Sequence, residues 1–129
     1  MFKDAQAFST FSVDDVPRAK EFYGKTLGLD VADEMDGLAL HLAGGGEVFV
    51  YPKGEDHAPA SFTVLNFPVE NDEAIEKAVD RLTEAGVEFE RYEGMEPDEK
   101  GIHRGQGPTI AWFKDPAGNI LSMIVVEQQ

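Results

Sequence analysis

The sequence contains the same order of structural signals twice, and this internal repeat limits the fold more than any other feature. In each half, a short segment of alternating apolar residues leads into a helical pattern that stops at a glycine. The first segment covers residues 8–13 and its helix stops at Gly28, and the second covers residues 61–69 and its helix stops at Gly86. Glycine readily adopts the left-handed conformation that ends many helices. The repeat therefore predicts two copies of one strand–helix unit.

Both predicted helices begin with a capping signal and carry one apolar face. Asp14 or Asp15 can cap the first helix, and Pro17 suits its first turn because the N–H that proline lacks would have no helical partner there. Residues 70–72 supply the cap of the second helix. Apolar residues then recur at the helical spacing of three to four. They are Val16, Ala19, Phe22, Tyr23 and Leu27 in the first helix and Ala74, Ile75, Ala78, Val79, Leu82 and Ala85 in the second.

Three short strand candidates follow each helix. They cover residues 30–35, 38–43 and 48–51 in the first half and residues 87–92, 109–114 and 120–126 in the second. Asp36-Gly37 between two apolar runs is a strong hairpin signal. Residues 115–119 combine proline, glycine and asparagine, which is typical of a turn.

The order of elements is thus strand, helix and three strands, twice over. We predict an α+β protein with two tandem βαβββ modules, about 5–55 and about 60–127, within one domain that covers residues 1–129. Each module alone would leave one face of its sheet uncovered. Two modules side by side can curl their sheets around a shared cleft.

The composition excludes several classes of function. The chain has no cysteine, which rules out disulfides, thiolate metal sites and cysteine nucleophiles. Its formal net charge of −14 repels phosphate backbones and anionic lipids, so we expect neither nucleic acid nor a membrane as a partner. No apolar run approaches the length of a membrane span and no secretory signal is visible, so we expect a cytoplasmic protein. The same charge would favour a cationic ligand.

Three short motifs, in this order and spacing, give the chain a family resemblance. They are Val13-Asp14 ahead of the first helix, Phe22-Tyr23 with Leu27-Gly28-Leu29 at its end, and residues 115–119 before the last strand. Together with the internal repeat, they make the whole chain resemble the vicinal-oxygen-chelate superfamily, which includes glyoxalase I, extradiol dioxygenases and the bleomycin- and fosfomycin-resistance proteins. The resemblance implies a curved mixed sheet around a cleft, a homodimer and a small-molecule ligand.

The resemblance also implies positions for metal ligands, and this chain does not fill them. Enzymes of the superfamily place ligands on the first and last strand of each module. Carried over by position, those sites fall at Phe8 and Val64 on the first strands, and at Val50 or Tyr51 and at Ser122 on the last strands. Divalent ions in such sites need imidazole or carboxylate donors. We therefore expect no metal and no other cofactor, and we count Phe8, Tyr51, Val64 and Ser122 among the ligand-binding candidates.

Chemistry without a metal would need acid–base groups, and two segments offer them. Tyr51 and Lys53 share one face if their strand persists, and either can act as acid or base when desolvated. The alternative is an ordinary strand end that runs into a solvated loop. The long loop of residues 93–108 contains His103 and Arg104, which can bind an anionic group, and its glycines would let it move as a lid. The alternative is a surface hairpin without a ligand.

Two strand residues of the second half complete the candidate site. Asn66 lies in the middle of a strand, where it either faces the cleft and orients a ligand or bonds within the sheet. Trp112 offers a large aromatic wall for a planar ligand, although most such residues belong to a core. Strand alternation puts Trp112 on one face with Ile110, and puts Ala111 and Phe113 on the other.

Three functions remain open on these grounds. The first is a metal-independent small-molecule-binding protein, similar to the drug-sequestering members of the superfamily, with a cationic or planar ligand. The second is a lyase, isomerase or dioxygenase that uses Tyr51, Lys53 or His103 as acid and base, or an atypical metal site. The three histidines lack local ligand spacing, which disfavours that metal site. The third is a regulatory or interaction module with a vestigial cleft, which aromatic packing around Phe8 would favour.

Overall fold

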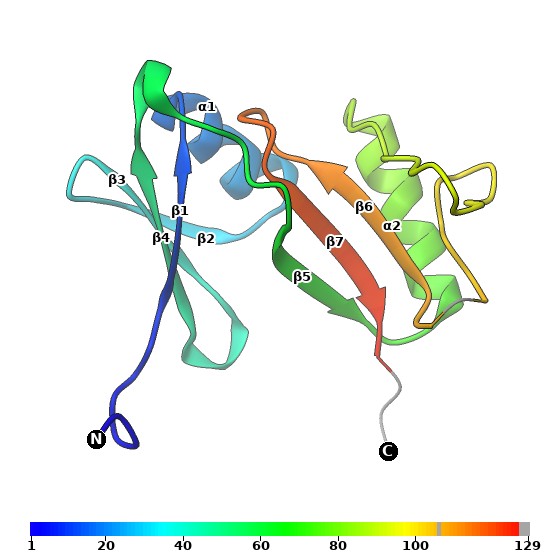
Figure 1. The fold of residues 1–129 in the computed structure, drawn as a ribbon, viewed down its shortest axis with the longest axis horizontal. Coiled ribbons are helices and arrows are strands. Elements are labelled where there is room, and N and C mark those ends of the chain that lie inside the picture. Colours follow the sequence, from blue (N-terminus) through cyan, green and yellow to red (C-terminus); the bar gives the residue numbers. More distant parts are fainter. Residues whose placement is uncertain (106, 127–129) are drawn as a thin grey trace. The chain divides into compact units, whose positions relative to one another are not determined.

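Each half of the sequence forms its own mixed sheet with a helix packed on it (Figure 1). The computed structural model describes residues 1–105 and 107–126, and its two compact units are Met1–Pro59 and Ala60–Gln129. The predicted α+β class is confirmed by these two mixed sheets. No helix in the described part of the chain is long and apolar enough to cross a membrane.

The first unit contains a four-stranded sheet. Its elements are β1 (Ser9–Val13), α1 (Val16–Glu21), a π-helical segment (Phe22–Thr26), β2 (Asp30–Glu34), β3 (Gly37–His41) and β4 (Glu47–Pro52), with short 3₁₀ turns at Ala43–Gly45 and Gly54–Asp56. The strand order is β1-β4-β3-β2, in which β1 and β4 are parallel and the other pairs antiparallel. In β1 and β4 alternate residues enter the core, whereas β3 buries four consecutive residues, 37–40. In the core the rings of Phe11 and Tyr23 lie 5.9 Å apart.

The first helix begins as predicted but ends differently. The Asp15 side chain accepts a hydrogen bond from the Arg18 backbone N–H at 3.1 Å, which confirms the cap. The α-helix ends at Glu21, and the chain continues as the π-helical segment. There the Leu27 N–H donates to the Phe22 carbonyl at 2.9 Å, five residues back. The predicted helix therefore exists over its whole length, but its second half is wound more widely.

The β2–β3 hairpin turns one residue earlier than predicted. Met35 and Asp36 occupy its two central positions with φ of 47° and 66°, and Gly37 already pairs with Glu34. Glycine is still required at position 37, because a Cβ there would lie 2.1 Å from the Val50 carbonyl oxygen. The glycine of the hairpin signal thus permits the close approach of β3 and β4 rather than a positive φ.

The second unit contains a three-stranded sheet and a longer helix. Its elements are β5 (Thr63–Val69), α2 (Asp72–Glu84), β6 (Ile110–Lys114) and β7 (Ile120–Val125). The strand order is β5-β7-β6, in which β5 and β7 are parallel and β6 and β7 antiparallel. The Asn71 side chain caps α2 by accepting from the Ala74 N–H at 2.8 Å. The predicted apolar stripe is buried at Ile75, Val79 and Leu82, and β6 buries Ala111 and Phe113.

The predicted strand over residues 87–92 is wrong. Within the described residues, an isolated bridge between Phe89 and Phe113 is all that pairs there. His103 forms a second isolated bridge, with Ile110, farther along β6. Two separate segments, one around Phe89 and one around His103, therefore pair with β6 or its end, and neither pairs over enough residues to form a strand. The intervening loop runs beside α2 (Figure 1).

Candidate functional site

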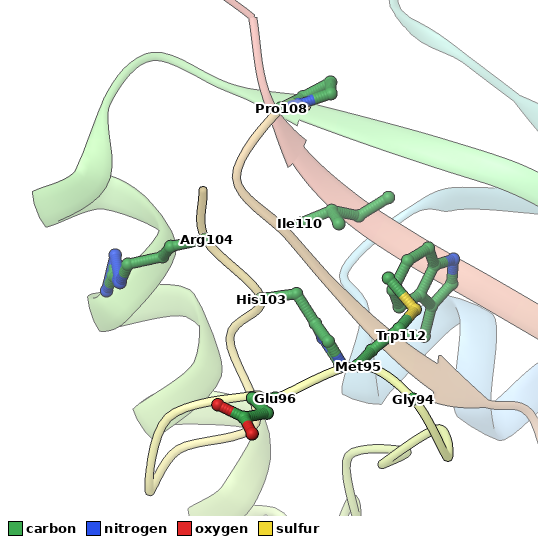
Figure 2. Close-up of a pocket in the computed structure, with 8 residues that line it drawn as sticks. All are labelled: Gly94, Met95, Glu96, His103, Arg104, Pro108, Ile110 and Trp112. Atoms are coloured by element: carbon green, nitrogen blue, oxygen red, sulfur yellow. The ribbon is translucent and has the colours of Figure 1, made fainter. Parts of the chain in front are cut away.

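The second unit contains a cavity of about 640 Å³ between β6 and the loop of residues 93–108. Its lining combines apolar side chains with an imidazole and a carboxylate. Figure 2 shows the lining residues, which are Gly94, Met95, Glu96, His103, Arg104, Pro108, Ile110 and Trp112. We call this cavity the His103 pocket. Its volume lies within the range of ordinary small-molecule sites.

Backbone and side-chain hydrogen bonds fix the loop that carries His103. The His103 N–H donates to the Ile110 carbonyl at 2.8 Å, and the Ile110 N–H donates back at 3.1 Å. The Asp98 carboxylate accepts from the Ile102 N–H at 2.9 Å. The Arg91 guanidinium donates to the Asp98 carbonyl at 3.1 Å. Part of the loop is thus bonded into the pocket wall, and within it Pro97 pairs with His103 as a short hairpin.

The imidazole of His103 is buried in this wall without a hydrogen-bond partner. The residue is 5% exposed, and among the residues that the structure describes neither ring nitrogen has a partner. The ring meets Trp112 edge-on, with centroids 5.1 Å apart and planes at 69°. In Figure 2 the ring nitrogens point toward the segment that carries Met95. A buried polar group without a partner costs roughly 1–3 kcal/mol, and such a group in a native protein calls for an explanation, such as a catalytic role, a bound water or an ion.

Trp112 forms the aromatic wall of the pocket. Its indole Nε1 donates to Thr63 Oγ1 at 3.2 Å, which pairs its polar atom and restrains the ring. Tyr92 packs edge-on against the indole at 5.4 Å, and its hydroxyl is buried without a partner among the described residues. Burial raises the pKa of the Tyr92 hydroxyl, the Glu90 carboxylate raises it further, and the Lys114 ammonium lowers it. Tyr92 is therefore neutral at physiological pH and able to donate a hydrogen bond.

Arg104 directs its charge away from the pocket. Its guanidinium points toward α2 (Figure 2), where its nitrogens lie 3.9 Å from Asp72, 3.3 Å from Glu76 and 3.4 Å from Asp98. Sequence reasoning placed Arg104 beside the ligand as an anion-binding group, whereas here its charge joins the loop to α2. Glu96 brings a carboxylate to the pocket wall. The charges around the pocket therefore do not favour an anionic ligand.

Two further candidates lie on the same row of the sheet as Trp112. Ser122 pairs with Trp112 on one side and with Asn66 on the other, so the three side chains share one face. Ser122 is fully buried, and its hydroxyl donates to Asn66 Oδ1 at 2.5 Å. The side-chain carbonyl of Asn66 therefore bonds within the sheet, which is the second of the two roles expected for this residue. Val64 is half-buried and lies at a register irregularity of β5.

The remaining candidates lie in the first unit. Phe8 precedes β1, is 66% exposed and lines a second cavity, of about 180 Å³. Tyr51 stacks on Phe49, with ring centroids 6.4 Å apart and planes at 22°. Lys53 is exposed, as a solvated strand end would be. Val50 is fully buried in the core, so of the two alternative last-strand positions only Tyr51 lies on the opposite face.

The side chains present do not fit a divalent metal ion. In the described part of the chain, no three His, Asp or Glu side chains come together as a ligand cluster. Phe8, Val64 and Ser122, at positions implied by the family resemblance, offer neither imidazole nor carboxylate. His41 and His57 each contact another side chain of their own unit, at 2.9 Å and 2.8 Å. We therefore assign no step of the chemistry to a metal.

Sequence reasoning singled out His103 and Trp112 but missed other parts of the site. Met95 and Glu96 line the pocket from the loop, and Tyr92 contacts the indole. Nothing in the local sequence distinguishes Met95 or Glu96 from other loop residues. Tyr92 could have been identified from the sequence, because it is an aromatic residue at the point where the predicted strand passes into the long loop.

Comparisons with known proteins agree with this architecture. The profile described as Glyoxalase/Bleomycin resistance protein/Dioxygenase superfamily matches residues 7–123. The structure of a lactoylglutathione lyase from Agrobacterium tumefaciens is similar, with a TM-score of 0.68, 17% sequence identity, and coverage of 95% of this chain and 96% of that chain. A genomically encoded fosfomycin resistance protein, FosX, from Listeria monocytogenes gives a TM-score of 0.69 at 15% identity, covering 93% of this chain and 91% of that chain.

A hypothetical protein from S. aureus gives a TM-score of 0.69 at 20% identity, covering 95% of this chain and 94% of that chain. At such identities the similarity concerns the fold alone. A comparison with curated proteins gives no significant match. The function must therefore be argued from the site itself.

Proposed function

The chain belongs to the glyoxalase/bleomycin resistance protein/dioxygenase superfamily, and on this premise we propose that it binds a small planar molecule in the His103 pocket without a metal ion. One observation carries the proposal. The His103 imidazole is 5% exposed, lies in the wall of a cavity of about 640 Å³ and has no partner among the described residues. A ligand that offers both a hydrogen-bond donor and an acceptor would supply the missing bonds and offset their cost.

The walls of the pocket support a planar, largely apolar ligand. Trp112, Ile110, Pro108 and Met95 provide apolar lining beside the imidazole. Aromatic rings favour offset-stacked or edge-on contact with a second ring. A planar ligand can therefore contact the indole while its polar edge reaches His103.

Ligand entry requires a small movement at Met95. The nitrogens of His103 are buried, and in Figure 2 they point toward the segment that carries Met95. Methionine is unbranched and has three rotatable bonds, so it can swing aside or repack on a ligand. The neighbouring Gly94 has a φ of 84°. Glycine adopts this conformation without the strain that other residues would suffer there.

Metal independence is the second part of the proposal. It is supported by the donor set, because the positions that the family resemblance implies for metal ligands hold Phe8, Val50 or Tyr51, Val64 and Ser122, none of which offers an imidazole or a carboxylate. The measurement is the metal content of purified protein after incubation with zinc, nickel, manganese and iron(II), together with melting curves with and without chelator. Stoichiometric metal and a melting temperature that falls on chelation would overturn this part.

Acid–base catalysis at the same site is the second candidate. An unpartnered imidazole beside a cavity is also what a proton-transfer enzyme needs, and the neutral Tyr92 hydroxyl lies near the same indole. Lys53 is exposed and does not line the His103 pocket. Aromatic packing around Phe8, which would have favoured a vestigial cleft, is not seen, because Phe8 is 66% exposed. Turnover of a bound compound that ceases in His103→Leu would favour the enzyme.

The test uses Trp112, the one tryptophan of the chain, as an internal probe. A set of planar heteroaromatic compounds is screened with chelator present, by quenching of tryptophan fluorescence and by the rise in melting temperature. Compounds that respond are titrated into wild type, His103→Leu and the control His41→Leu, whose histidine lies in the other unit. We expect His103→Leu to bind about tenfold or more weakly, which corresponds to one lost buried hydrogen bond. Equal affinity in all three proteins would refute the role of His103.

A further inference from the structure

The cavity in the first unit has a composition unlike that of the His103 pocket. Its volume is about 180 Å³, and its walls include Phe8, Phe49, Met35, Glu34 and Glu47. We call it the Phe8 cavity. All of its lining residues belong to the unit that ends at Pro59. It therefore shares no lining residue with the His103 pocket, and the argument for a ligand there does not depend on the proposed function.

The Phe8 cavity presents aromatic and thioether groups to solvent. Phe8 is 66% and Met35 82% exposed, so neither side chain is explained by burial in the core. The Phe49 ring is half-buried and held in place by stacking on Tyr51. Aromatic faces carry negative quadrupole potential and attract cations that come within about 6 Å of the ring centre. The walls are thus suited to a positive group with an apolar surface.

Carboxylates add negative charge to the same cavity. Glu34 and Glu47 line it, and none of its lining residues in the described chain is Lys or Arg. Glu47 has a neighbour in His41, whose Nδ1 lies 2.9 Å from its Oε1. The unit as a whole has 5 Lys and Arg against 11 Asp and Glu, a formal charge of −6. Such a field raises the local concentration of cations and repels anions.

We propose that the Phe8 cavity binds the alkylammonium group of a small molecule. The aromatic rings would contact the methyl or methylene surface of the cation, and Glu34 and Glu47 would compensate its charge. Size supports a head group rather than a larger ligand, because about 180 Å³ holds several water molecules but lies below the range of drug-sized pockets. The cation binds by replacing water at these walls, and no residue of the His103 pocket takes part.

The test compares two probes that differ only in charge. Choline carries a quaternary ammonium, and neohexanol is its uncharged isostere with carbon in place of nitrogen. Each is titrated into the intact chain at constant ionic strength, and amide NMR spectra report which residues respond. We expect choline to bind more tightly than neohexanol and to shift amides of residues 34–49 rather than 94–112. An exposed cation–aromatic contact alone would give about a two- to fivefold preference, and the carboxylates should increase it.

Variants separate the specific site from the overall charge. Glu34→Gln and Glu47→Gln each remove one carboxylate from the cavity and should weaken choline binding severalfold. Asp33→Asn is the matched control, because it removes the same charge from the adjacent position of β2, whose side chain points to the opposite face and lies 3.0 Å from Lys20. Phe49→Leu keeps an apolar side chain but removes the ring, so it should reduce choline binding more than neohexanol binding.

Each result either supports or overturns the proposed alkylammonium site in the Phe8 cavity. Preference for choline, lost in Glu47→Gln or Glu34→Gln and kept in Asp33→Asn, supports the site. Equal binding of the two probes, an equal loss in Asp33→Asn, or amide shifts confined to residues 94–112 would overturn it. Circular dichroism of every variant shows whether a loss of binding comes from a loss of fold. Because the planar-ligand screen reads Trp112 and this titration reads residues 34–49, either proposal can fail without the other.

Discussion

Replacing His103 by leucine should stabilise the protein while it weakens ligand binding. In the neutral imidazole one ring nitrogen is a donor and the other an acceptor, and both are buried without partners among the described residues. Each such group costs roughly 1–3 kcal/mol. Leucine removes both costs but loses the edge-on contact with Trp112, which lies 5.1 Å away and is worth about 0.5–1.5 kcal/mol. Imperfect packing of leucine costs about 1 kcal/mol more.

At the middle of these ranges about 4 kcal/mol is recovered and about 2 kcal/mol is lost, so the net gain is about 2 kcal/mol in the free energy of unfolding. For a chain of this size, such a gain raises the melting temperature by about 3–10 °C. The assay is urea unfolding followed by circular dichroism, with thermal melting as a second measure. His57→Leu is the matched control, because the His57 ring nitrogen lies 2.8 Å from Ser12 Oγ and that bond would be lost. We expect the control to lose about 0.5–1.5 kcal/mol.

The two substitutions should therefore change stability in opposite directions. A loss of more than about 1 kcal/mol in His103→Leu would refute the reasoning, because it would mean that the imidazole is satisfied in the folded protein. The pocket would then need no ligand to explain its histidine. A gain in stability combined with unchanged binding would separate the two claims and remove His103 from the proposed site.

Three further outcomes test other parts of the structure. Gly37→Ala should lower the free energy of unfolding by about 2–4 kcal/mol, measured by urea unfolding, because the new Cβ would lie 2.1 Å from the Val50 carbonyl oxygen. Asp115→Ala should cost about 2–4 kcal/mol in the same assay, because the buried carboxylate accepts from the Asn119 N–H at 2.8 Å and from its side-chain amide at 3.1 Å. Because burial raises the pKa of Tyr92 in the folded state, the unfolded chain loses this proton first, so stability should fall as the pH rises above about 10. Tyr92→Phe should remove that part of the alkaline decline, and an unchanged decline would contradict the assignment.

The parts of the fold that depend on neighbouring residues could be predicted from the sequence. The capping side chains of both helices and the apolar stripe of α2 were predicted because each follows from a few residues in local order. The face of Trp112 also followed from alternation alone. The hairpin turn shifted by one residue because the space beside Gly37 is set by the Val50 carbonyl on another strand. A contact of that kind is not visible in the residues around the turn.

The candidate site could not be predicted in full, because it depends on which segments of the chain pair with the outer edge of β6. A continuous strand over residues 87–92 would have paired along β6 and occupied the position where His103 now bonds to Ile110. Instead the chain leaves β6 after Glu90, and the ion pairs of Arg104 hold the returning segment on α2. The pocket is the space that this detour leaves between loop and sheet. The wrongly predicted strand and the unpartnered histidine thus have one cause, and local sequence rules are expected to fail in this way at functional or strained sites.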